Sequence, residues 1–557
     1  MKRQILPLIL ISISICSFGQ IKESQAIDSI FSEWNKSDVP GCALGIIQDG
    51  ALIYSKGYGL ANMEYDIPNS GSAVFRIGST SKQFTAACIV LLAEKNKLSL
   101  DDNLKSIFPD FPEYAEKITI KHLLNHTSGI RDYLMISYLK GLSEDDYYID
   151  GDVMNWLINQ SDLNFNPGEE FLYSNSGYWL LGQIVKNVSG KNMADFAHAE
   201  IFGPLAMNNT HFHNDHAQIV KNRASGYVPS GNDGYKISMT TLDMIGDGGV
   251  FTTINDIKKW DDSYYNSTVL SERFWDMMTQ QGILNSGEVI DYASGLFIDE
   301  YKGLKTIRHG GAFVGFRAEL LRFPEQRLSI AIFANRGDAS PSRMANQVAD
   351  LLLNENFTNV GVKNQDQKDV KKDEFVHLET NELENFSGHY WNNSSSLARR
   401  VYVKNDTLRY SRSETNESKL VPISKNEFKM INVQADVLVK FEVNEQRENT
   451  MSFIANGGKP SISIEYMPKV YTKDELLQLS GRYYSSELDV YYSLKPEDDL
   501  LMLYINDSKK SSLSPIMKNL FSNDDYGIFQ FNNDDEGRLS SFRLAAGRVK
   551  NLNFEKK

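Results

Sequence analysis

A run of apolar residues, 84–93, directly follows the polar stretch Ser79–Lys82 and has the length and composition of a buried helix. Gly78 precedes it and marks a turn, and Ser79 is a residue type favoured at the N-cap of a helix. Residues three apart on a helix share a face. The pattern therefore predicts a buried helix with the Ser79 hydroxyl and the Lys82 amine within reach of each other at its first turn.

Hydrophobic periodicity predicts strands and helices before and after this helix in the sequence. Residues 42–48 and 51–54 are typical of a hairpin turned at Asp49-Gly50. Further strands are expected at 294–300, 306–309, 316–323 and 328–335, and helices at 24–35, 119–125, 156–159, 177–188, 192–201, from 255 onward and at 342–354. Because the strands come from both ends of this segment, they should form one sheet with a helical insertion beside it.

Short alternating strands follow residue 376, and they contain an internal repeat. Residues 382–390 resemble residues 475–483, at an offset of roughly 90 residues that suits two successive small antiparallel barrels. The aromatic residues of these barrels should be core residues: Tyr390, Trp391, Tyr483 and Tyr484. The stretch before them, 359–376, is polar and rich in Lys, Asp and Gln, as a linker is.

With 557 residues the chain is too long for one core. The pattern predicts an α+β fold for the first large domain, with an antiparallel sheet flanked by helices plus a helical subdomain, followed by two small lipocalin-like β-barrels. The expected boundaries are a signal peptide over 1–19, the α+β domain over 20–358, a linker over 359–378, and barrels over 379–470 and 471–557.

The first residues carry the pattern of a secretory signal peptide. Lys2-Arg3 precede a short apolar run that ends in small residues, with cleavage expected near Gly19-Gln20. The run is too short for a confident membrane span, and no later stretch is long and apolar enough to cross a bilayer. Cys16 offers a lipoprotein alternative, although Ile15 before it fits poorly. We expect an exported protein, periplasmic or secreted.

Charge and cysteine content narrow the classes further. The net charge of −14, with no basic stripe to offset it, argues against a nucleic-acid partner. After cleavage only Cys42 and Cys88 remain. A disulfide between them is conceivable in an exported protein. However, Cys42 is expected in a strand and Cys88 in the buried helix, and these locations favour two buried thiols.

The chemistry expected at Ser79 is that of an activated nucleophile. The positive end of the helix and burial both disfavour the ammonium form of Lys82, so the neutral amine can act as a base towards the Ser79 hydroxyl. The Ser-x-x-Lys pattern alone is weak evidence, because it occurs again at Ser137 and Lys140 with no comparable buried helix after it.

A second candidate element is Tyr173-Ser174-Asn175. The tyrosine hydroxyl can relay a proton beside Lys82, and Asn175 can hold the lysine amine and a substrate amide. The same Tyr-x-Asn pattern recurs at 264–266, 390–392 and 504–506. Only the copy at a loop-to-helix junction in the first domain is a good candidate.

A third candidate element is His309-Gly310-Gly311-Ala312, expected at the end of one strand. Adjacent glycines would let a substrate backbone approach the strand edge closely, and the NH groups of Ala312 and Ser79 would form the oxyanion pair. His309 offers a donor or a cation, for a carboxylate or for the proton relay. The alternative is a glycine turn with an incidental histidine.

Taken in order, Ser-x-x-Lys at 79–82, Tyr-x-Asn at 173–175 and His-Gly-Gly at 309–311 resemble the motifs of the penicillin-recognising serine hydrolases. The similarity is to the class C beta-lactamase-like family, which includes D-alanyl-D-alanine carboxypeptidases, D-aminopeptidases and esterases. It extends over about 21–354, with secondary matches at 122–129 and 248–250. The resemblance implies that Ser79 is acylated, that Lys82 and Tyr173 form its base system, and that C-terminal barrels help shape the entrance to the site.

One motif departs from the class C pattern. Class C beta-lactamases carry Lys-Thr-Gly at the third element, whereas His309-Gly310-Gly311 is closer to the His-x-Gly of D-aminopeptidases. The resemblance therefore ranks a peptidase acting on D-amino-acid-containing peptides first, an esterase second and a beta-lactamase third. The competing class is a non-catalytic protein whose barrels hold cell-wall fragments.

Other chemistries have weaker support in the sequence. His211, His213 and His216 lie near Asp215, but their spacing fits no regular metal-ligand set. No Gly-x-Ser-x-Gly elbow and no Gly-rich phosphate loop after a strand occurs. We expect no metal or organic cofactor, and a small-molecule or peptide substrate.

Overall fold

The computed structural model describes residues 22–143, 146–231, 234–357, 375–412, 416–431, 433, 437–455 and 458–557. The chain divides into two compact units. The first comprises Met1–Asp102, Thr119–Asn125 and Tyr178–Gly361, and the second comprises Asn103–Ile118, His126–Gly177 and Val362–Lys557. The predicted signal peptide, with Cys16, and most of the predicted linker lie outside the described residues.

The first unit is built on a six-stranded antiparallel sheet in the order β10-β11-β12-β13-β1-β2. Its strands are β1 (Cys42–Gln48), β2 (Ala51–Tyr58), β10 (Phe297–Tyr301), β11 (Leu304–Phe313), β12 (Phe316–Phe323) and β13 (Leu328–Ala334). The N-terminal hairpin joins the C-terminal strands where β1 pairs with β13, with Cys42 opposite Ala334. This confirms the prediction of one sheet made from both ends of the segment.

The β1–β2 hairpin turns at the predicted Asp49-Gly50. Both residues have positive φ, 50° and 74°, which is the conformation that a two-residue hairpin turn needs. Side chains then alternate along β1: Leu44 and Ile46 enter the core on one face, and Gly45 faces α9 (Ile254–Ser263) on the other. A Cβ at Gly45 would lie 2.3 Å from the Ile254 side chain, so glycine allows this helix to approach the strand.

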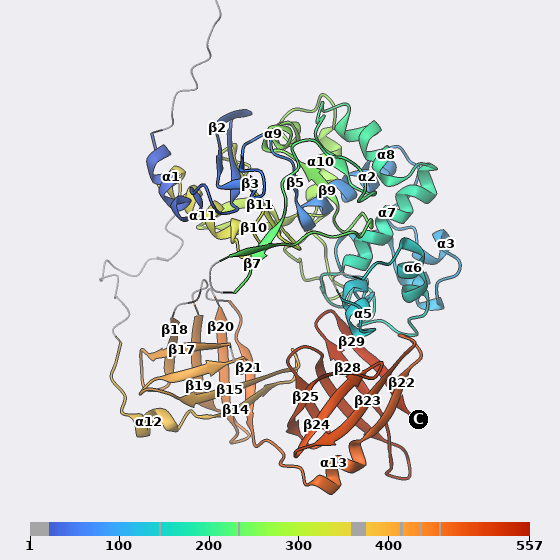
Figure 1. The fold of residues 1–557 in the computed structure, drawn as a ribbon, viewed down its shortest axis with the longest axis vertical. Helices are drawn as coiled ribbons and strands as arrows, with labels where there is room; N and C mark the ends of the chain where they lie inside the picture. The colour runs from blue at the N-terminus through green and yellow to red at the C-terminus, as the bar shows by residue number, and fades with distance from the viewer. Residues whose placement is uncertain are drawn as a thin grey trace, which may run out of the picture. The chain divides into compact units, whose positions relative to one another are not determined.

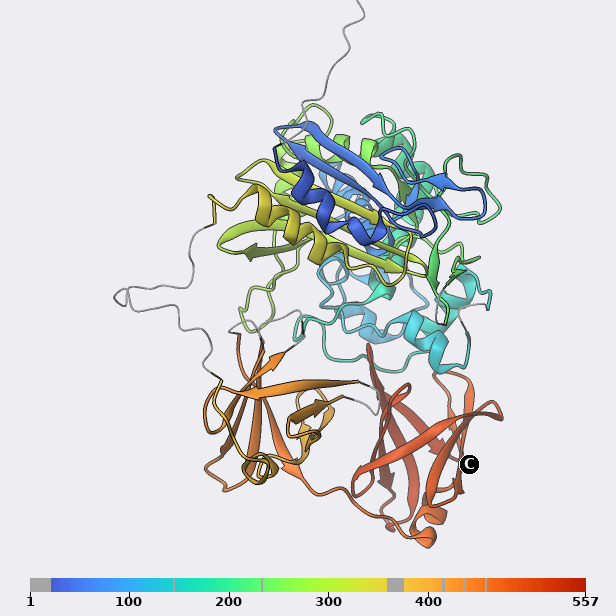
Figure 2. The same cartoon turned by 60° about the vertical axis from the view of Figure 1, so that its left-hand side comes forward.

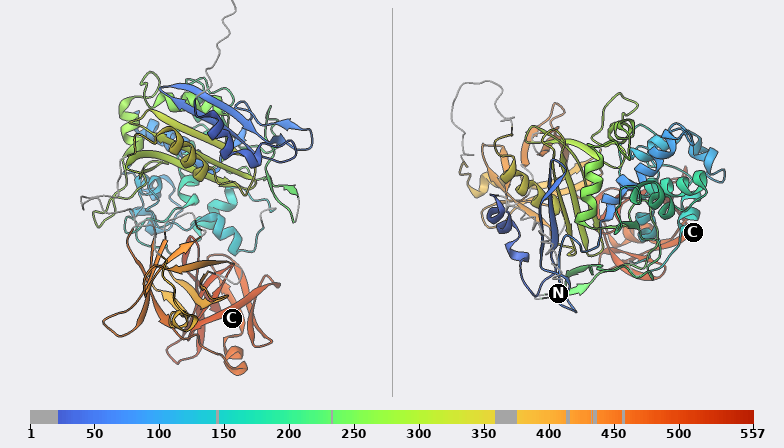
Figure 3. Two further views of the ribbon diagram at one scale, coloured as in Figure 1. Left: turned by 90° about the vertical axis from the view of Figure 1, so that its left-hand side faces the viewer. Right: turned by 90° about the horizontal axis from the view of Figure 1, so that it is seen from above.

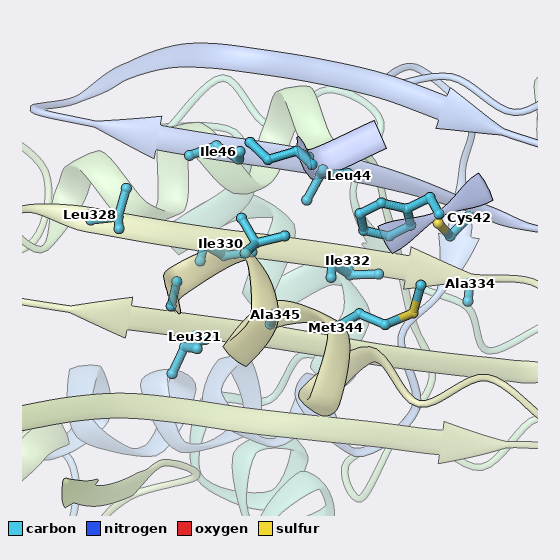
Figure 4. Close-up of a cluster of buried hydrophobic side chains, with 14 of the residues drawn as sticks. Cys42, Leu44, Ile46, Leu321, Leu328, Ile330, Ile332, Ala334, Met344 and Ala345 are labelled. Atoms are coloured by element: carbon cyan, nitrogen blue, oxygen red, sulfur yellow. The ribbon is translucent and has the colours of Figure 1, made fainter. Parts of the chain in front are cut away.

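Two helices from opposite ends of the first unit, α1 (Ser24–Ile30) and α11 (Pro341–Leu352), cover one face of the sheet (Figures 2 and 3). Met344 and Ala345 of α11 lie over β12 and β13 (Figure 4). This face takes every second residue of the strands. The residues between them, such as Ala43, Ala331 and Phe333, are buried on the other face, so the strands read as near-continuous hydrophobic runs. The core residues labelled there on the strands are Cys42, Leu44, Ile46, Leu321, Leu328, Ile330, Ile332 and Ala334.

The other elements of the first unit include the predicted buried helix, α2, in which Lys82 through Leu92 are all buried. Phe84 of α2 packs against Trp260 and Phe202, with ring centroids 4.7 and 5.4 Å apart. The remaining elements are η1 (Ser32–Trp34), β3 (Leu60–Asn62), β4 (Ile67–Pro68), β5 (Phe75–Arg76), η2 (Gly78–Ser81), α2 (Lys82–Glu94), α4 (Ile120–Leu124), α7 (Asn175–Ser189), whose first turn belongs to the second unit, α8 (Met193–Ala197), η4 (His198–Phe202), β6 (His211–Phe212), β7 (Tyr227–Pro229), β8 (Tyr235–Ile237), β9 (Val250–Thr252), α9 (Ile254–Ser263) and α10 (Glu272–Thr279).

The two cysteines of the described chain are buried free thiols, as the sequence favoured. Burial raises the pKa of both Cys42 and Cys88, so neither is a reactive thiolate. Within the described residues, no helix combines the length and the apolar character that a membrane span requires.

The second unit contains a helical segment and two closed eight-stranded antiparallel barrels (Figure 1, orange and red). The helices are α3 (Leu104–Ile107), η3 (Glu113–Lys117), α5 (Tyr133–Leu139), α6 (Asp150–Ile158), α12 (Thr380–Glu384) and α13 (Lys473–Leu479). Barrel 1 consists of β14 (Gly388–Asn392), β15 (Leu397–Val403), β16 (Leu408–Ser411), β17 (Glu417–Pro422), β18 (Glu427–Ile431), β19 (Val437–Val443), β20 (Asn449–Ala455) and β21 (Ser461–Tyr466). Barrel 2 consists of β22 (Gly481–Ser485), β23 (Val490–Glu497), β24 (Leu500–Ile505), β25 (Ser508–Met517), β26 (Leu520–Asn523), β27 (Gly527–Asn533), β28 (Leu539–Ala546) and β29 (Val549–Lys556). The predicted fold class is confirmed.

The internal repeat marks the same corner in each barrel, where a short helix leads into the first strand. Tyr390 donates to the Phe386 carbonyl at 3.0 Å, and Tyr483 donates to the Leu479 carbonyl at 2.8 Å. Tyr390, Trp391 and Tyr483 are buried, as predicted. Tyr484 is only half-buried and donates to Asp489, so its prediction as a core residue was wrong: it points away from the barrel interior, as alternation along β22 requires.

Candidate active site

The nucleophile candidate lies on η2, which leads directly into α2. Lys82 Nζ donates to Ser79 Oγ at 3.3 Å and to the Asp247 carbonyl at 2.5 Å. Lys82 is fully buried, whereas Ser79 is partly exposed. The predicted pairing of hydroxyl and amine is confirmed, and it places a fully buried amine beside a partly exposed serine.

Ser79 does not cap the helix, contrary to the prediction. It lies inside the 3₁₀ turn, and α2 begins only at Lys82. Its side chain receives the lysine amine instead of a backbone NH. The neighbouring Ser81 hydroxyl accepts from Val250 NH at 3.0 Å and so fixes the turn against β9.

The Asp247 carbonyl is presented to Lys82 by a glycine turn at 246–249. Gly246 and Gly249 have φ of 118° and 91°, and a Cβ at Gly246 would lie 2.6 Å from the Tyr178 carbonyl. The Gly246 carbonyl accepts from Thr85 of α2 at 2.5 Å. Nothing in the sequence pattern indicated that a backbone oxygen of this turn holds the lysine amine.

The His-Gly-Gly element lies within β11 and does not end the strand at His309 as predicted. β11 continues to Phe313 and pairs with β12, with Gly310 opposite Glu319 and Gly311 opposite Ala318. Two glycines weaken a strand pattern in sequence, but here the strand is held by pairing on one edge and by η2 on the other side.

The glycines admit the chain's own backbone close to β11. A Cβ at Gly311 would lie 1.9 Å from the Ile77 carbonyl, and one at Gly78 would lie 2.8 Å from Ala312 N. A Cβ at Gly310 would instead meet the Glu319 carboxyl at 3.0 Å, on the face covered by α11. The close approach that the glycines permit is therefore that of the nucleophile turn, and it places the Ala312 NH next to Gly78.

His309 is buried, and both of its ring nitrogens have partners within the first unit. Nδ1 donates to the Gly310 carbonyl at 2.6 Å, so Nε2 of the neutral ring accepts from Tyr292 Oη at 3.1 Å. Burial and the nearby Lys82 charge lower the pKa of His309 to about 3. At neutral pH the ring is uncharged, so His309 does not supply the cation considered as an alternative from the sequence.

The backbone of His309 also ties β11 to the nucleophile turn. Thr80 Oγ1 donates to the His309 carbonyl at 3.1 Å, and the Thr80 carbonyl accepts from Gln83 at 2.9 Å. Gln83 in turn accepts from the Trp260 indole NH at 2.6 Å. A chain of buried hydrogen bonds thus fixes the position of Ser79 relative to the strand. Neither Tyr292 nor Trp260 carried a signal in the sequence.

Glu319 lies on β12 beneath the His-Gly-Gly element, and its burial predicts a pH effect on stability. Desolvation raises its pKa from 4.5 to about 7, despite the hydrogen bond from Ser342. Because the folded state binds this proton more tightly, stability falls as pH rises from 4.5 through 7. The Glu319→Gln variant lacks this loss and should gain about 3 kcal/mol over the wild type at pH 8.

Thermal unfolding of both proteins between pH 4 and pH 8 tests this effect. The two unfolding temperatures should agree near pH 4, where both side chains are uncharged, and separate as pH rises. A constant difference across the range would show that Glu319 ionises normally.

Tyr173 and Asn175 lie in the second unit, at the predicted junction of a loop with a helix. Asn175 begins α7, and its backbone NH donates to Asp132 Oδ2 at 2.7 Å. Asp132 is the N-cap of α5, with its other oxygen accepting from Leu134 and Met135 NH groups. Asp132 had no signal in the sequence, because its role depends on a contact 43 residues along the chain.

His126 supports the same segment. Its Nδ1 accepts from Ser174 NH at 3.1 Å, and its ring centroid lies 4.1 Å from that of Tyr173. His126 has φ of 58°, a conformation uncommon outside glycine, which turns the chain between α4 and the loop. The secondary match at 122–129 included this histidine without indicating its partner.

The second Ser-x-x-Lys copy lacks the geometry of the first. Ser137 lies in α5 and donates to the Leu134 carbonyl at 2.9 Å, while Lys140 donates to the Leu488 carbonyl of barrel 2. In the histidine group, His211 Nε2 lies 3.2 Å from His213 Nδ1. The described residues contain no group of His, Cys, Asp or Glu arranged to hold a metal ion.

Known proteins match this chain in sequence and in fold. The beta-lactamase family model matches residues 27–355. Penicillin-binding protein 4* of Bacillus subtilis is 31% identical over 310 residues, covering 52% of this chain and 66% of that protein. The D-aminopeptidase of Brucella anthropi is 26% identical over 317 residues, covering 57% of this chain and 59% of that protein. The chain thus spans about three fifths to two thirds of the length of these relatives.

Solved structures agree with the fold. The octameric penicillin-binding protein homologue from Pyrococcus abyssi superposes with a TM-score of 0.55 at 22% identity, covering 87% of this chain and 99% of that one. The D-amino acid amidase from Ochrobactrum anthropi SV3 superposes with a TM-score of 0.51 at 23% identity, covering 60% and 99%. The family model matches more than half of this chain, and the chain therefore belongs to the beta-lactamase family of serine hydrolases.

Proposed function

We propose that this protein is an exported serine hydrolase that forms an acyl-enzyme on Ser79 and acts on peptides containing D-amino acids. The observation that carries the proposal is the buried Lys82 amine 3.3 Å from the partly exposed Ser79 hydroxyl. A buried amine next to a partly exposed serine hydroxyl is an arrangement that activates a serine nucleophile. Export rests on the signal-peptide pattern of residues 1–19.

The reaction proceeds by double displacement. Ser79 Oγ attacks the carbonyl carbon, and its proton passes through Lys82 and Tyr173 to the leaving amine or alcohol. The NH groups of Ser79 and Ala312 stabilise the oxyanion, and Asn175 holds the lysine amine and the substrate amide. Water then attacks the ester carbonyl, one proton of that water passes to Ser79 Oγ, and the acid product leaves.

The chemistry of the third element favours an amine-terminal or neutral substrate over a carboxylate. His309 is uncharged at neutral pH and has partners at both nitrogens, so it offers no positive charge where class C enzymes place a lysine. Two relatives are named D-aminopeptidase and D-amino acid amidase. A D-aminopeptidase or amidase activity therefore ranks first. An esterase ranks second, because an uncharged site also accepts esters.

Intact-mass measurement on the mature protein tests the acylation step. Exposure to a fluorophosphonate should add one adduct, and Ser79→Ala should prevent it. Ser137→Ala is the matched control, because Ser137 belongs to the other Ser-x-x-Lys pattern and should leave labelling unchanged. An adduct that persists in Ser79→Ala would refute the nucleophile assignment.

Paired substrates test the substrate class. D-alanine p-nitroanilide should be cleaved at least 10-fold faster than its L-isomer, and a peptide ending in D-alanyl-D-alanine should be a poor substrate. A stable penicillin adduct would instead point to a carboxylate-binding pocket. Labelling by neither the penicillin nor the fluorophosphonate would favour a non-catalytic protein that holds cell-wall fragments.

A further inference from the structure

Barrel 2 is fixed to the helical segment that carries Tyr173, within the second unit. The side chain of Asn164 in this segment binds backbone atoms on either side of Val549, where the turn between β28 and β29 leads into β29. Asn164 donates to the Arg548 carbonyl at 3.0 Å and accepts from Lys550 NH at 2.7 Å. The buried Arg131 donates to the Lys550 carbonyl at 3.1 Å. These contacts hold the turn in one position, so the side chain at its tip is directed by the barrel.

That side chain is Arg548, and its guanidinium lies over the ring of Tyr173. The guanidinium carbon is 4.7 Å from the ring centroid, within the range of a cation–π interaction. Its Nη1 also donates to Asp132 Oδ2 at 3.4 Å. The same Asp132 oxygen accepts from Asn175 NH at 2.7 Å. One Arg–Asp pair therefore contacts both residues of the Tyr-x-Asn element.

Arg548 and Asp132 form an ion pair, and the cation of that pair lies against the ring of Tyr173. The Asp132 side chain is 2% exposed and is engaged by four donors: the NH groups of Leu134, Met135 and Asn175, and Arg548. The Arg548 side chain is 42% exposed and faces the ring directly. The ring of His126, which is also titratable, packs against the ring of Tyr173. A cation over a phenol ring stabilises the negative charge of the phenolate.

We propose that Arg548 of barrel 2 is a positioning residue for Tyr173, which fixes the orientation of the ring and favours its phenolate form. The inference rests on the proposed function only in taking Tyr173 as part of the proton relay. It assigns barrel 2 a direct part in preparing that relay. It explains why an element more than 370 residues away in sequence carries the cation.

Removing the cation should slow the relay and change its pH dependence. Arg548→Met keeps the length of the side chain and should lower kcat for a D-aminoacyl anilide by roughly 5- to 30-fold, with KM within twofold. The acidic limb of the kcat profile should move up by about one pH unit. Arg548→Lys, which keeps the charge, should recover most of kcat. Arg543→Met removes an exposed arginine from β28 and should change neither.

A spectroscopic readout separates this inference from the proposed function. With ¹³C-labelled tyrosine and Tyr173→Phe to assign the signal, Arg548→Met should shift the ionisation of Tyr173 to higher pH, whether or not the protein turns over substrate. Unlabelled Ser79 with a shifted Tyr173 titration would refute the proposed function and support the positioning role. An unchanged titration in a folded Arg548→Met protein, or equal loss in Arg548→Lys, would overturn the positioning role.

Discussion

Replacing Lys82 with methionine is expected to lower kcat/KM by roughly 10³- to 10⁴-fold while the protein remains folded. The substitution removes the amine that donates to Ser79 Oγ and to the Asp247 carbonyl. Methionine fills a similar volume, so no large cavity forms in α2. The desolvation cost of a buried amine is removed, whereas the Asp247 carbonyl loses this donor, and the two effects offset within about 1–2 kcal/mol.

Hydrolysis of an activated ester and thermal unfolding measure the two sides of this prediction. Lys97→Met serves as the matched control, since Lys97 is an exposed lysine just after the same helix. A Lys82→Met protein that unfolds near the wild-type temperature and keeps more than a tenth of its activity would show that the lysine is structural. Loss of activity together with unfolding would leave Ser79→Ala labelling as the decisive measurement.

The sequence was informative about the nucleophile because its geometry is local. Ser79 and Lys82 are one helical turn apart, and the apolar residues after them required burial on every side of α2. The details of capping were not predictable, since η2 and the contact of Ser81 with Val250 depend on a strand 169 residues later. The local pattern therefore predicted the Ser79–Lys82 pair, whereas the turn that holds this pair depends on tertiary contacts.

The His-Gly-Gly element shows the opposite case. Two glycines suggest the end of a strand when only the sequence is seen. In the fold, β12 pairs with them, and the missing Gly311 side chain admits the Ile77 carbonyl. The glycines could be noticed in the sequence, but the partner that makes them necessary lies more than 230 residues away.

The barrels were predictable because their corners, like the Ser79–Lys82 pair, are formed by residues close in sequence. The contacts of barrel 2 with the Tyr-x-Asn element were not predictable because, like those of the glycines, they join residues far apart in sequence. Each barrel begins with a local helix–strand corner, where Tyr390 or Tyr483 closes onto a carbonyl four residues earlier. The repeat is therefore visible in the sequence. The contacts of Arg548 with Asp132 and Tyr173 leave no such pattern, because they join segments that share no periodicity.

Loss of Glu487 is expected to destabilise the second unit by about 3–5 kcal/mol, the largest effect on stability that we predict. Glu487, in the loop between β22 and β23, pairs with Arg131, and the two side chains are 6% and 0% exposed. Arg131 also donates to Gln160 at 2.9 Å, and Ser161 NH donates to Glu487 at 3.1 Å. Glu487→Ala therefore leaves the buried Arg131 guanidinium without its counter-charge. The desolvation free energy of that charge is then no longer offset by the ion pair.

Urea unfolding with hydrogen exchange read out over residues 126–177 and 481–556 measures this loss locally. Asp534→Ala is the control, because it breaks an ion pair to Arg538 on the same barrel whose arginine is 71% exposed. The apolar double variant Arg131→Met/Glu487→Leu should be more stable than the sum of its two single variants predicts, by about 1–3 kcal/mol, since it leaves no buried charge behind. Recovery should stay partial, because Arg131 also serves the Lys550 and Asn551 carbonyls. Additive single variants, or unchanged exchange in Glu487→Ala, would mean that this pair does not hold barrel 2 to the segment of Tyr173.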